Sequence, residues 1–357
     1  MPVTSILLFV EDPGGANMAI DLPQVIMDQG HRMALMASGH AIRYLEDRGV
    51  TCQSIPDGMD ANALLDKFES DIVVTATSEN PDSFGLTLVD AANHRGIPSV
   101  GLIDMSCNAG LRFRGRSDSA LAHAPDHLIV PDATTRNAFL ALGFPSERLA
   151  VLGHPQYDRV WRRRMKLETG PPRTPQAHPR WVFVAEGYDL LNRSASFCMP
   201  EYTLHGRGDT DWRTGIVLEE VLDAAGRYSP RPEIVVRLHP KNSRKDFTRW
   251  TAEISLDDAC DPFPGLWNAD IVLGMTSMLL VEAAILGRPV LAVLPRAEER
   301  AWLGPLANDN IPSVTHREAL LAWLDGFNSG NRHRICPECW TEPGATKRIA
   351  DYLLRLS

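Results

Sequence analysis

Short apolar runs alternate along the first half of the chain with stretches that have the spacing of amphipathic helices. The apolar runs predict strands at 5–10, 31–37, 51–54, 71–76, 97–103, 126–130 and 148–152. Helices are predicted at 18–28, 41–48, 61–68, 84–95 and 132–142, and a glycine-containing turn at 11–17. Strands that alternate with helices in this way predict a parallel sheet with helices on both faces.

The second half of the chain repeats this pattern. Its predicted strands lie at 181–185, 233–238, 271–273, 290–294 and 311–314, and its helices at 212–227, 278–286, 317–327 and 345–356. Residues 162–180 contain three consecutive arginines and several prolines without periodicity, which predicts a linker. The predicted fold class is therefore α/β, with two Rossmann-like domains at 1–165 and 178–342. A C-terminal helix within 343–357 could cross back onto the first domain.

Composition limits the class of protein. The chain has 357 residues, of which 44% are hydrophobic and 23% charged, as in soluble globular proteins with room for two domains. Its net charge of -9 disfavours a general nucleic-acid binder, because phosphate contacts need a basic surface. No apolar run reaches the length of a transmembrane helix, and no secretory signal is visible, so we expect a cytoplasmic protein.

The six cysteines are scattered and do not suggest a disulfide framework. Only Cys336 and Cys339, with His333 just upstream, have the spacing of metal ligands. A structural zinc site needs a fourth ligand, and no second pair is visible in the sequence. Ordinary thiols are therefore the preferred interpretation, zinc is the alternative, and no metal is predicted at the functional site.

The segment 270–294 contains two strands, one helix and one polar turn. Thr276 and Ser277 stand where the helix begins, so they can cap it and leave backbone N–H groups free to bind phosphate. Glu282 follows within an otherwise apolar helix, where a carboxylate could accept hydrogen bonds from a ribose diol. The alternative is that the hydroxyls only cap a buried helix and that Glu282 reaches solvent or an arginine.

Two more strand ends in the second half carry polar groups. One predicted strand continues into Glu186 and Gly187, and another leads through Arg237 to His239 and Lys241. Because alternate residues of a strand share a face, the three basic side chains could meet a diphosphate together. A histidine satisfied within the structure is the alternative interpretation for His239.

In the first half, the polar groups at strand ends are Asp12, the segment 75–79 and Asp104. Gly14 and Gly15 would let a ligand approach the backbone, with Asn17 close by, although this is not the dinucleotide fingerprint. A tight turn without a ligand is the alternative interpretation.

The loop after Asp104 has Arg112, Arg114 and Arg116 at alternate positions. Such a group of guanidinium side chains would suit an anionic acceptor or a phosphate. An exposed loop that is basic by chance is an equal alternative.

Together, the two halves, the linker, the Thr276–Ser277 turn with Glu282, and the Gly287-x-Pro289 segment resemble the GT-B glycosyltransferase superfamily over nearly the whole chain. Within it, residues 97–112 and 129–155 are similar to the corresponding region of the non-hydrolysing UDP-N-acetylglucosamine 2-epimerases, although their Ser-Gly-Gly turn is lacking. The resemblance implies that two domains face each other across a cleft. It also implies that Thr276 and Ser277 bind the nucleotide phosphates and that Glu282 binds ribose.

The ordered motifs Glu186-Gly187, His239-Pro240 and Thr276-Ser277 also resemble those of bacterial sialyltransferases and capsule polymerases that use CMP-sugars. In that family the acidic residue is the general base and the histidine meets the nucleotide phosphate, which implies these roles for Glu186 and His239. This chain has one acidic residue where the fuller motif has two.

The sequence thus predicts a metal-independent glycosyltransferase. Its donor would be a UDP- or CMP-linked sugar, with no other cofactor, and its acceptor a small molecule or glycan bound in the cleft. His239 would stabilise the leaving phosphate, and the base would be Glu186, Asp12 or Asp104, which the sequence does not rank. The alternatives are an epimerase or hydrolase acting on a UDP-amino sugar, and a non-catalytic nucleotide-binding protein. No nucleic-acid partner is expected, and an oligomer is possible.

Overall fold

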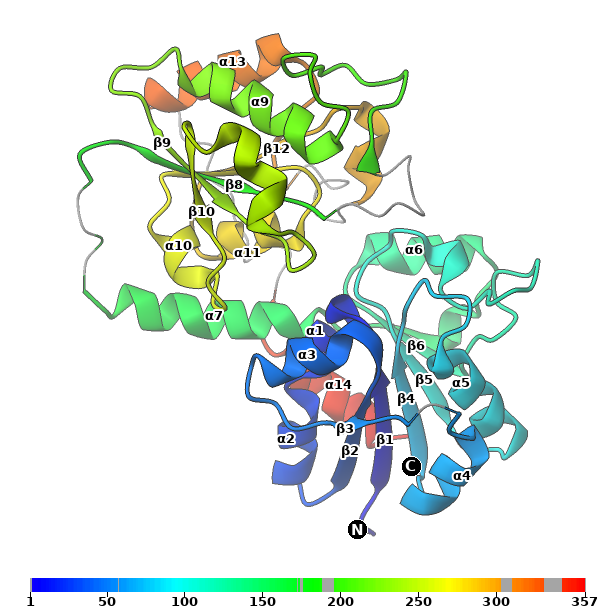
Figure 1. The fold of residues 1–357 in the computed structure, drawn as a ribbon. Helices are drawn as coiled ribbons and strands as arrows, with labels where there is room; N and C mark the ends of the chain where they lie inside the picture. Colours follow the sequence, from blue (N-terminus) through cyan, green and yellow to red (C-terminus); the bar gives the residue numbers. More distant parts are fainter. Residues whose placement is uncertain are drawn as a thin grey trace. The chain divides into compact units, whose positions relative to one another are not determined.

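The computed structural model describes residues 2–56, 58–171, 173, 176–187, 196–302, 310–330 and 342–356. The chain divides into two compact units, shown in Figure 1: unit 1 is Met1–Arg159 with Thr341–Ser357, and unit 2 is Val160–Trp340. Each unit is built on its own sheet, and every strand pair in both sheets is parallel. The prediction of two Rossmann-like α/β domains is therefore confirmed.

The sheet of unit 1 has the strand order β3-β2-β1-β4-β5-β6-β7. Its strands are β1 (Ser5–Val10), β2 (Arg32–Ala37), β3 (Gln53–Ser54), β4 (Ile72–Ala76), β5 (Ser99–Leu102), β6 (His127–Val130) and β7 (Leu149–Val151). Its helices are α1 (Pro13–Ala19), α2 (Leu22–Asp28), α3 (Gly39–Glu46), α4 (Ala61–Phe68), α5 (Phe84–His94) and α6 (Ala133–Ala141), with short 3-10 turns η1 (Ala109–Leu111) and η2 (Ser146–Arg148). All six residues of β1 are buried. Alternate residues of β1 belong to separate core clusters, so helices cover both faces of this sheet.

The predicted glycine turn at 11–17 is wrong, because most of this segment is helix α1. Asp12 is the N-cap, and its Oδ1 accepts a hydrogen bond from the Gly15 N–H at 2.7 Å. Pro13 occupies the first turn, where its missing N–H costs nothing. Gly14 and Gly15 therefore lie in the first turn of a helix directly after the central strand.

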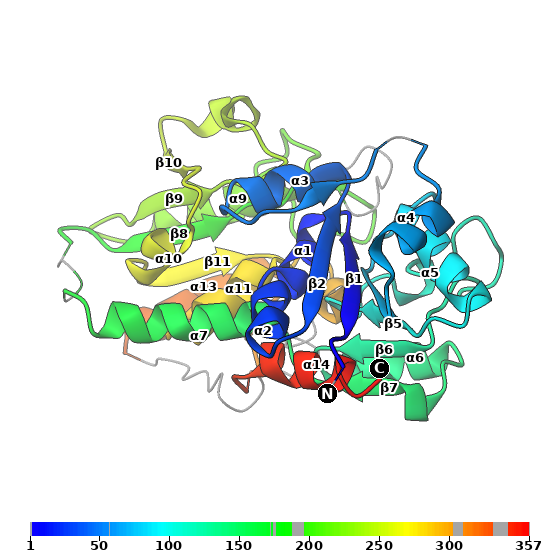
Figure 2. The ribbon, with the colours of Figure 1, turned by 90° about the horizontal axis from the view of Figure 1, so that it is seen from below.

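The helix α14 (Ala345–Leu353) belongs to unit 1, although it ends the chain. Ile349, Ala350 and Leu353 are fully buried in the same core cluster as residues of α2, which lies beside α14 in Figure 2. Asp158 caps the start of α14, because its carboxylate accepts hydrogen bonds from the Thr346 N–H at 2.8 Å and the Thr346 hydroxyl at 2.7 Å.

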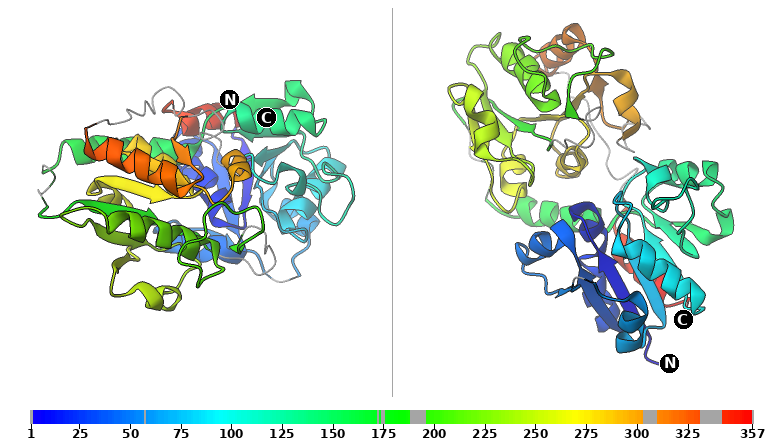
Figure 3. Two further views of the ribbon diagram at one scale, coloured as in Figure 1. Left: turned by 90° about the horizontal axis from the view of Figure 1, so that it is seen from above. Right: turned by 45° about the vertical axis from the view of Figure 1, so that its right-hand side comes forward.

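The sheet of unit 2 has the strand order β10-β9-β8-β11-β12-β13. Its strands are β8 (Arg180–Val184), β9 (Glu233–Arg237), β10 (Ile254–Asp257), β11 (Ile271–Gly274), β12 (Val290–Val293) and β13 (Ser313–Val314). Its helices are α9 (Arg213–Ala225), α10 (Phe263–Trp267), α11 (Met278–Ile285) and α13 (Arg317–Asn328), with 3-10 turns η3 (Arg244–Trp250) and η4 (Ala297–Trp302). Helices α9 and α13 contact each other, as do α10 and α11, and the two pairs lie on opposite sides of the sheet in Figure 1. Two further views of the ribbon are given in Figure 3.

The predicted linker at 162–180 is wrong in its first part, because helix α7 (Pro155–Glu168) extends through it. No glycine or further proline interrupts this segment, and arginine, lysine, leucine and glutamate favour helix. Two of the three consecutive arginines have separate partners: Arg163 contacts Asp261 at 2.6 Å, and Arg164 donates to the Ile285 carbonyl at 3.0 Å. Among the described helices, none is long and apolar enough to span a membrane.

Candidate functional site

Both sheets contain a topological switch point, where the strand order reverses beside a central strand. In unit 1 it lies between β1 and β4, and in unit 2 between β8 and β11. Ligands of open parallel sheets bind at the carboxyl ends of the strands beside such a point. Each unit therefore has its own candidate site, and in each the residues after the strand ends decide the chemistry.

In unit 2, the structure brings together the residues that follow β8 and β11. The Glu186 Oε1 atom accepts hydrogen bonds from the Thr276 N–H at 2.5 Å and from the Thr276 hydroxyl at 3.1 Å. The Glu186 Oε2 atom forms an ion pair with Arg213. Both oxygens of Glu186 are thus engaged within the protein.

Arg213 is the main residue that the sequence reasoning missed. Its side chain is 3% exposed, and its guanidinium group bridges Glu186 and the fully buried Glu299. Burial alone would raise the pKa of Glu186, but the Arg213 charge and the hydrogen bonds from Arg213 and Thr276 hold that pKa below its usual value. One sequence signal was available: Arg213 is the first residue of α9, where the helix dipole disfavours a cation without an anionic partner.

His239 follows β9, the strand on the other side of β8. Its Nδ1 atom accepts a hydrogen bond from the Lys241 N–H at 3.1 Å, so the neutral ring carries its proton on Nε2. Burial lowers the pKa of His239 to about 4, which keeps the ring neutral near pH 7. A Cβ atom on Gly187 would lie 2.8 Å from His239 Nδ1, so the glycine after Glu186 makes room for the histidine.

The other predicted phosphate donors, Arg237, Lys241 and Ser277, each have different surroundings. Arg237 forms an ion pair with Asp257 at 3.2 Å, and Lys241 is exposed. Ser277 caps α11, because its hydroxyl accepts a hydrogen bond from the Leu279 N–H at 3.2 Å. The N–H of Thr276 is taken by Glu186. Within the described part of the chain, the next two N–H groups, those of Ser277 and Met278, have no partner.

Glu282 lies in the middle of α11 and is 4% exposed. It is the one acidic residue of a helix made otherwise of apolar side chains, as the sequence indicated. It lies about one and a half turns after Ser277, the residue that caps this helix.

In unit 1, Asp12 and Asp104 follow β1 and β5. The Arg112 Nη1 atom lies 3.1 Å from Asp104 Oδ1, and Arg112 is 4% exposed. Burial and the Asp104 charge raise the pKa of Asp12 to about 6. A Cβ atom on Gly14 would lie 2.3 Å from Asp104 Oδ2, so the first turn of α1 lies directly against this second carboxylate.

The three predicted loop arginines do not form one cluster. Arg112 is buried against Asp104, whereas Arg114 is exposed and donates to the Ser117 carbonyl at 2.7 Å. Arg116 pairs with Asp82 at 2.6 Å. The loop contains turns instead of an extended strand, so alternate residues do not share a face.

Asn17 and His154 complete the surroundings of α1 and β7. The Asn17 Oδ1 atom accepts hydrogen bonds from the Tyr44 hydroxyl and the Arg159 Nη2 atom, both at 2.8 Å, so this side chain already holds parts of unit 1 together. His154 was not predicted as a site residue. It is 3% exposed, and burial lowers its pKa to about 4.

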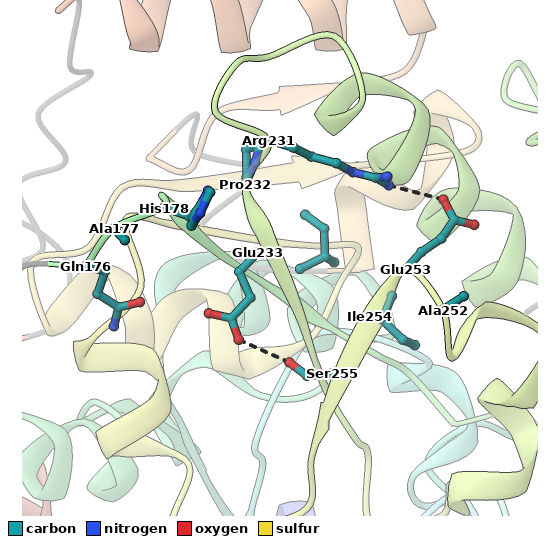
Figure 4. Close-up of a pocket in the computed structure, with 11 residues that line it drawn as sticks. Gln176, Ala177, His178, Arg231, Pro232, Glu233, Ala252, Glu253, Ile254 and Ser255 are labelled. Atoms are coloured by element: carbon teal, nitrogen blue, oxygen red, sulfur yellow. Dashed lines mark hydrogen bonds and ion pairs between the residues drawn. The ribbon is translucent and has the colours of Figure 1, made fainter.

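Unit 2 also contains a pocket of about 600 Å³ at the amino ends of β9 and β10, shown in Figure 4. Its charged groups are paired with each other or with neighbours: Arg231 contacts Glu253 at 3.1 Å, and Glu233 contacts Arg180 at 3.0 Å. The pocket is at the opposite end of these strands from His239 and does not include the predicted site. The possible zinc ligands His333, Cys336 and Cys339 lie outside the described residues.

A chain with two parallel-sheet units of this kind, whose polar groups gather at the carboxyl ends of the strands, has the GT-B class of fold. No protein-family model and no curated protein sequence matches it. It is similar to the solved UDP-GlcNAc 2-epimerase from Neisseria meningitidis bound to UDP-GlcNAc, with 15% identity, a TM-score of 0.66 and coverage of 98% of this chain and 99% of that chain.

Two further solved structures are similar over the same length. The UDP-GlcNAc 2-epimerase from Methanocaldococcus jannaschii in complex with UDP-GlcNAc and UDP has 13% identity, a TM-score of 0.68 and coverage of 98% and 99%. The glycotransferase of kitacinnamycin has 13% identity, a TM-score of 0.62 and coverage of 100% of both chains. At these identities the similarity establishes the fold alone, and the predicted GT-B resemblance is confirmed at that level.

Proposed function

We propose that this protein is a glycosyltransferase that takes a sugar from a UDP- or CMP-linked donor and needs no metal for the transfer. The observation that carries the proposal is in unit 2, where Glu186, His239 and Thr276 converge from three adjacent strand ends at the switch point. Three short motifs that are far apart in the sequence thus form one constellation beside unused backbone donors.

The donor phosphates are proposed to bind at the start of α11. The N–H groups of Ser277 and Met278 are available there, and the helix dipole favours an anion. Neutral His239 can donate its Nε2–H to a phosphate oxygen as negative charge develops on the leaving nucleotide. Glu282 is the proposed ribose acceptor. These donors would supply the stabilisation that a metal supplies in other transferases.

The general base is proposed to be Asp12. Its pKa of about 6 leaves it mostly deprotonated at pH 7, yet more basic than an ordinary aspartate. Glu186 is a weaker candidate, because Arg213 and Thr276 occupy its oxygens. Asp104 pairs with Arg112 at 3.1 Å, and its charge contributes to the raised pKa of Asp12. The expectation that both sites open onto one cleft remains a prediction.

An epimerase or hydrolase is the second candidate. Two of the similar structures are UDP-GlcNAc 2-epimerases, and the Asp12 and Asp104 carboxylates could move a proton on the sugar itself. Such a reaction would need no acceptor.

The test is to incubate the protein with UDP- and CMP-linked sugars, with and without a panel of glycan and small-molecule acceptors. A transferase releases nucleotide only when an acceptor is present, and forms a new glycoside. An isomerised donor without acceptor would identify an epimerase, and free sugar would identify a hydrolase. Tight nucleotide binding without any turnover would contradict both enzymatic proposals.

A further inference from the structure

We propose that Arg213 is a positioning residue of the nucleotide site, which acts by holding Glu186 against the turn at Thr276 and Ser277. The inference deepens the proposed function and rests on it. It assigns Glu186 the task of fixing the phosphate-binding turn, and it assigns Arg213 the task of fixing Glu186.

The first turn of α9 holds Glu186 at two points. Arg213 pairs with the Glu186 side chain, and the Thr214 hydroxyl donates to the Glu186 carbonyl oxygen at 3.0 Å. Both residues are buried, with exposed fractions of 3% and 1%. Consecutive residues of one rigid helix thus fix both the backbone and the carboxylate of the residue after β8.

The charged groups around Arg213 pair with one another. Arg213 pairs with Glu186 and Glu299, and Glu299 also accepts a hydrogen bond from the Arg296 Nε atom at 3.0 Å. The Trp302 ring centre lies 5.6 Å from the guanidinium carbon of Arg213. Glu299 is fully buried, so removal of Arg213 would leave its carboxylate with Arg296 alone and would take the ion-pair partner from the half-buried Glu186.

Lysine cannot replace Arg213 fully, because one ammonium group lacks the planar fork that serves two carboxylates at once. With lysine, Glu186 would lose its fixed orientation while the net charge stayed the same. Arg213→Lys therefore isolates geometry from charge.

The hydrogen bonds of Thr276 link the position of Glu186 to nucleotide affinity. Its N–H and hydroxyl both donate to Glu186, at 2.5 Å and 3.1 Å, so they anchor the turn and do not serve the phosphate. The anchor sets the direction of the next two N–H groups, on Ser277 and Met278. If Glu186 moves, these donors lose their preorganisation, and nucleotide affinity falls although neither donor has been changed.

The experiment measures UDP and CMP binding by isothermal titration calorimetry for four proteins: wild type, Arg213→Lys, Glu186→Gln and the double variant. We expect each single variant to weaken binding by about tenfold, the loss of roughly one charge-assisted hydrogen bond. The double variant should bind no more weakly than the weaker single variant, since both changes release the same anchor.

The matched control is Arg317→Lys. Arg317 pairs with the buried Glu220, which lies on the same helix α9, at 2.6 Å. It does not contact Glu186, so this variant should lose stability and keep wild-type affinity.

Wild-type affinity in Arg213→Lys, or additive losses in the double variant, would overturn the positioning role while leaving the proposed function intact. If Arg213→Lys does not fold, the variant Arg213→Lys with Glu299→Gln has one cation for one carboxylate, and the same tenfold loss is expected. A folded wild type that binds no nucleotide would overturn the proposed function, and this inference with it.

Discussion

The two switch points have the same topology, but the pKa values of their acids are shifted in opposite directions. Asp12 in unit 1 has its pKa raised to about 6 by burial and by Asp104, whereas Glu186 in unit 2 has its pKa lowered. The difference lies in the counter-charge. Arg213 pairs directly with Glu186, while Arg112 pairs with Asp104, and no cation among the described residues forms an ion pair with Asp12. The fold supplies the position of an acid, and the nearest guanidinium decides whether it can exchange a proton near pH 7.

A comparison of His154 with His239 also shows that the neighbouring groups decide what a side chain can do. His154 and His239 both precede a proline, both accept a hydrogen bond at Nδ1 from the N–H two residues on, and burial lowers both pKa values to about 4. Their neighbours differ: the ring centres of His154 and Tyr157 lie 5.0 Å apart, whereas His239 lies against Gly187, the residue after Glu186. The same local turn therefore serves packing in one unit and a candidate ligand site in the other.

The largest expected effect comes from Asp12→Asn. Loss of the general base should lower the turnover number by about 10²- to 10⁴-fold and leave nucleotide affinity unchanged. Asparagine can still cap α1 through its Oδ1 atom. Transfer assays and calorimetry on the same preparation check both parts.

The same variant should gain stability at high pH. The folded-state pKa of Asp12 is raised, so its stabilising contribution is present at low pH and is lost as pH rises from about 4 through about 6. Asp12→Asn should therefore melt a few degrees above wild type at pH 7.5, with no gain below pH 4. Asp132→Asn is the control, because Asp132 caps α6 in the same way at 2.7 Å. Equal losses of turnover in both variants would refute the catalytic role.

The second-largest expected effect comes from removing the neutral His239 ring, the proposed hydrogen-bond donor of unit 2. His239→Ala should weaken UDP and CMP binding by roughly 10- to 100-fold, since hydrogen bonds to charged groups are the stronger ones. His154→Ala should destabilise the protein without changing nucleotide affinity. Calorimetry and thermal melts on both variants test the comparison, which fails if the two histidines behave alike.

The pH dependence separates the two sites without any mutation. Turnover should fall about tenfold per pH unit below pH 6 as Asp12 becomes protonated. Affinity for the nucleotide-sugar donor, measured without acceptor, should stay flat between pH 5 and 8, because His239 is neutral above about pH 4 and Glu186 stays ionised. A donor affinity that falls together with turnover would assign the titrating group to unit 2.

The smallest effects come from the glycines. Gly187→Ala puts a methyl group 2.8 Å from His239 Nδ1, so the ring must shift, and we expect a severalfold loss of nucleotide affinity. Gly326→Ala in helix α13 is the control, because no other side chain of the described residues lies within 4 Å of a Cβ atom at Gly326. It should be neutral or slightly stabilising. Equal affinities in the two variants would show that the spacing at Gly187 does not matter.

Much of the fold was predictable because buried parallel strands leave a strong signal. Runs such as 6–10 and 290–294 are apolar throughout, and the polar residues after them mark the sheet edge where ligands bind. The order of Glu186, His239 and Thr276 in the chain predicted their convergence, because their strands occupy adjacent places in one sheet.

The rest depends on contacts that local sequence does not encode. Arg213 and Glu299 are 27 and 113 residues from Glu186, so their pairing follows only from the packed structure. The start of α1 was missed because its glycines suggested a turn, although Asp12 and Pro13 form a strong helix start. The arginines of α7 suggested a linker, although Arg163 and Arg164 each have a partner on a neighbouring element.

The most direct test of the central claim is amide hydrogen exchange of the wild-type protein with and without saturating UDP or CMP. If the nucleotide binds where we propose, exchange should slow in peptides that contain Ser277 and Met278 and in those that contain His239 and Lys241. Tight binding that leaves these peptides unchanged and protects other segments would contradict the claim.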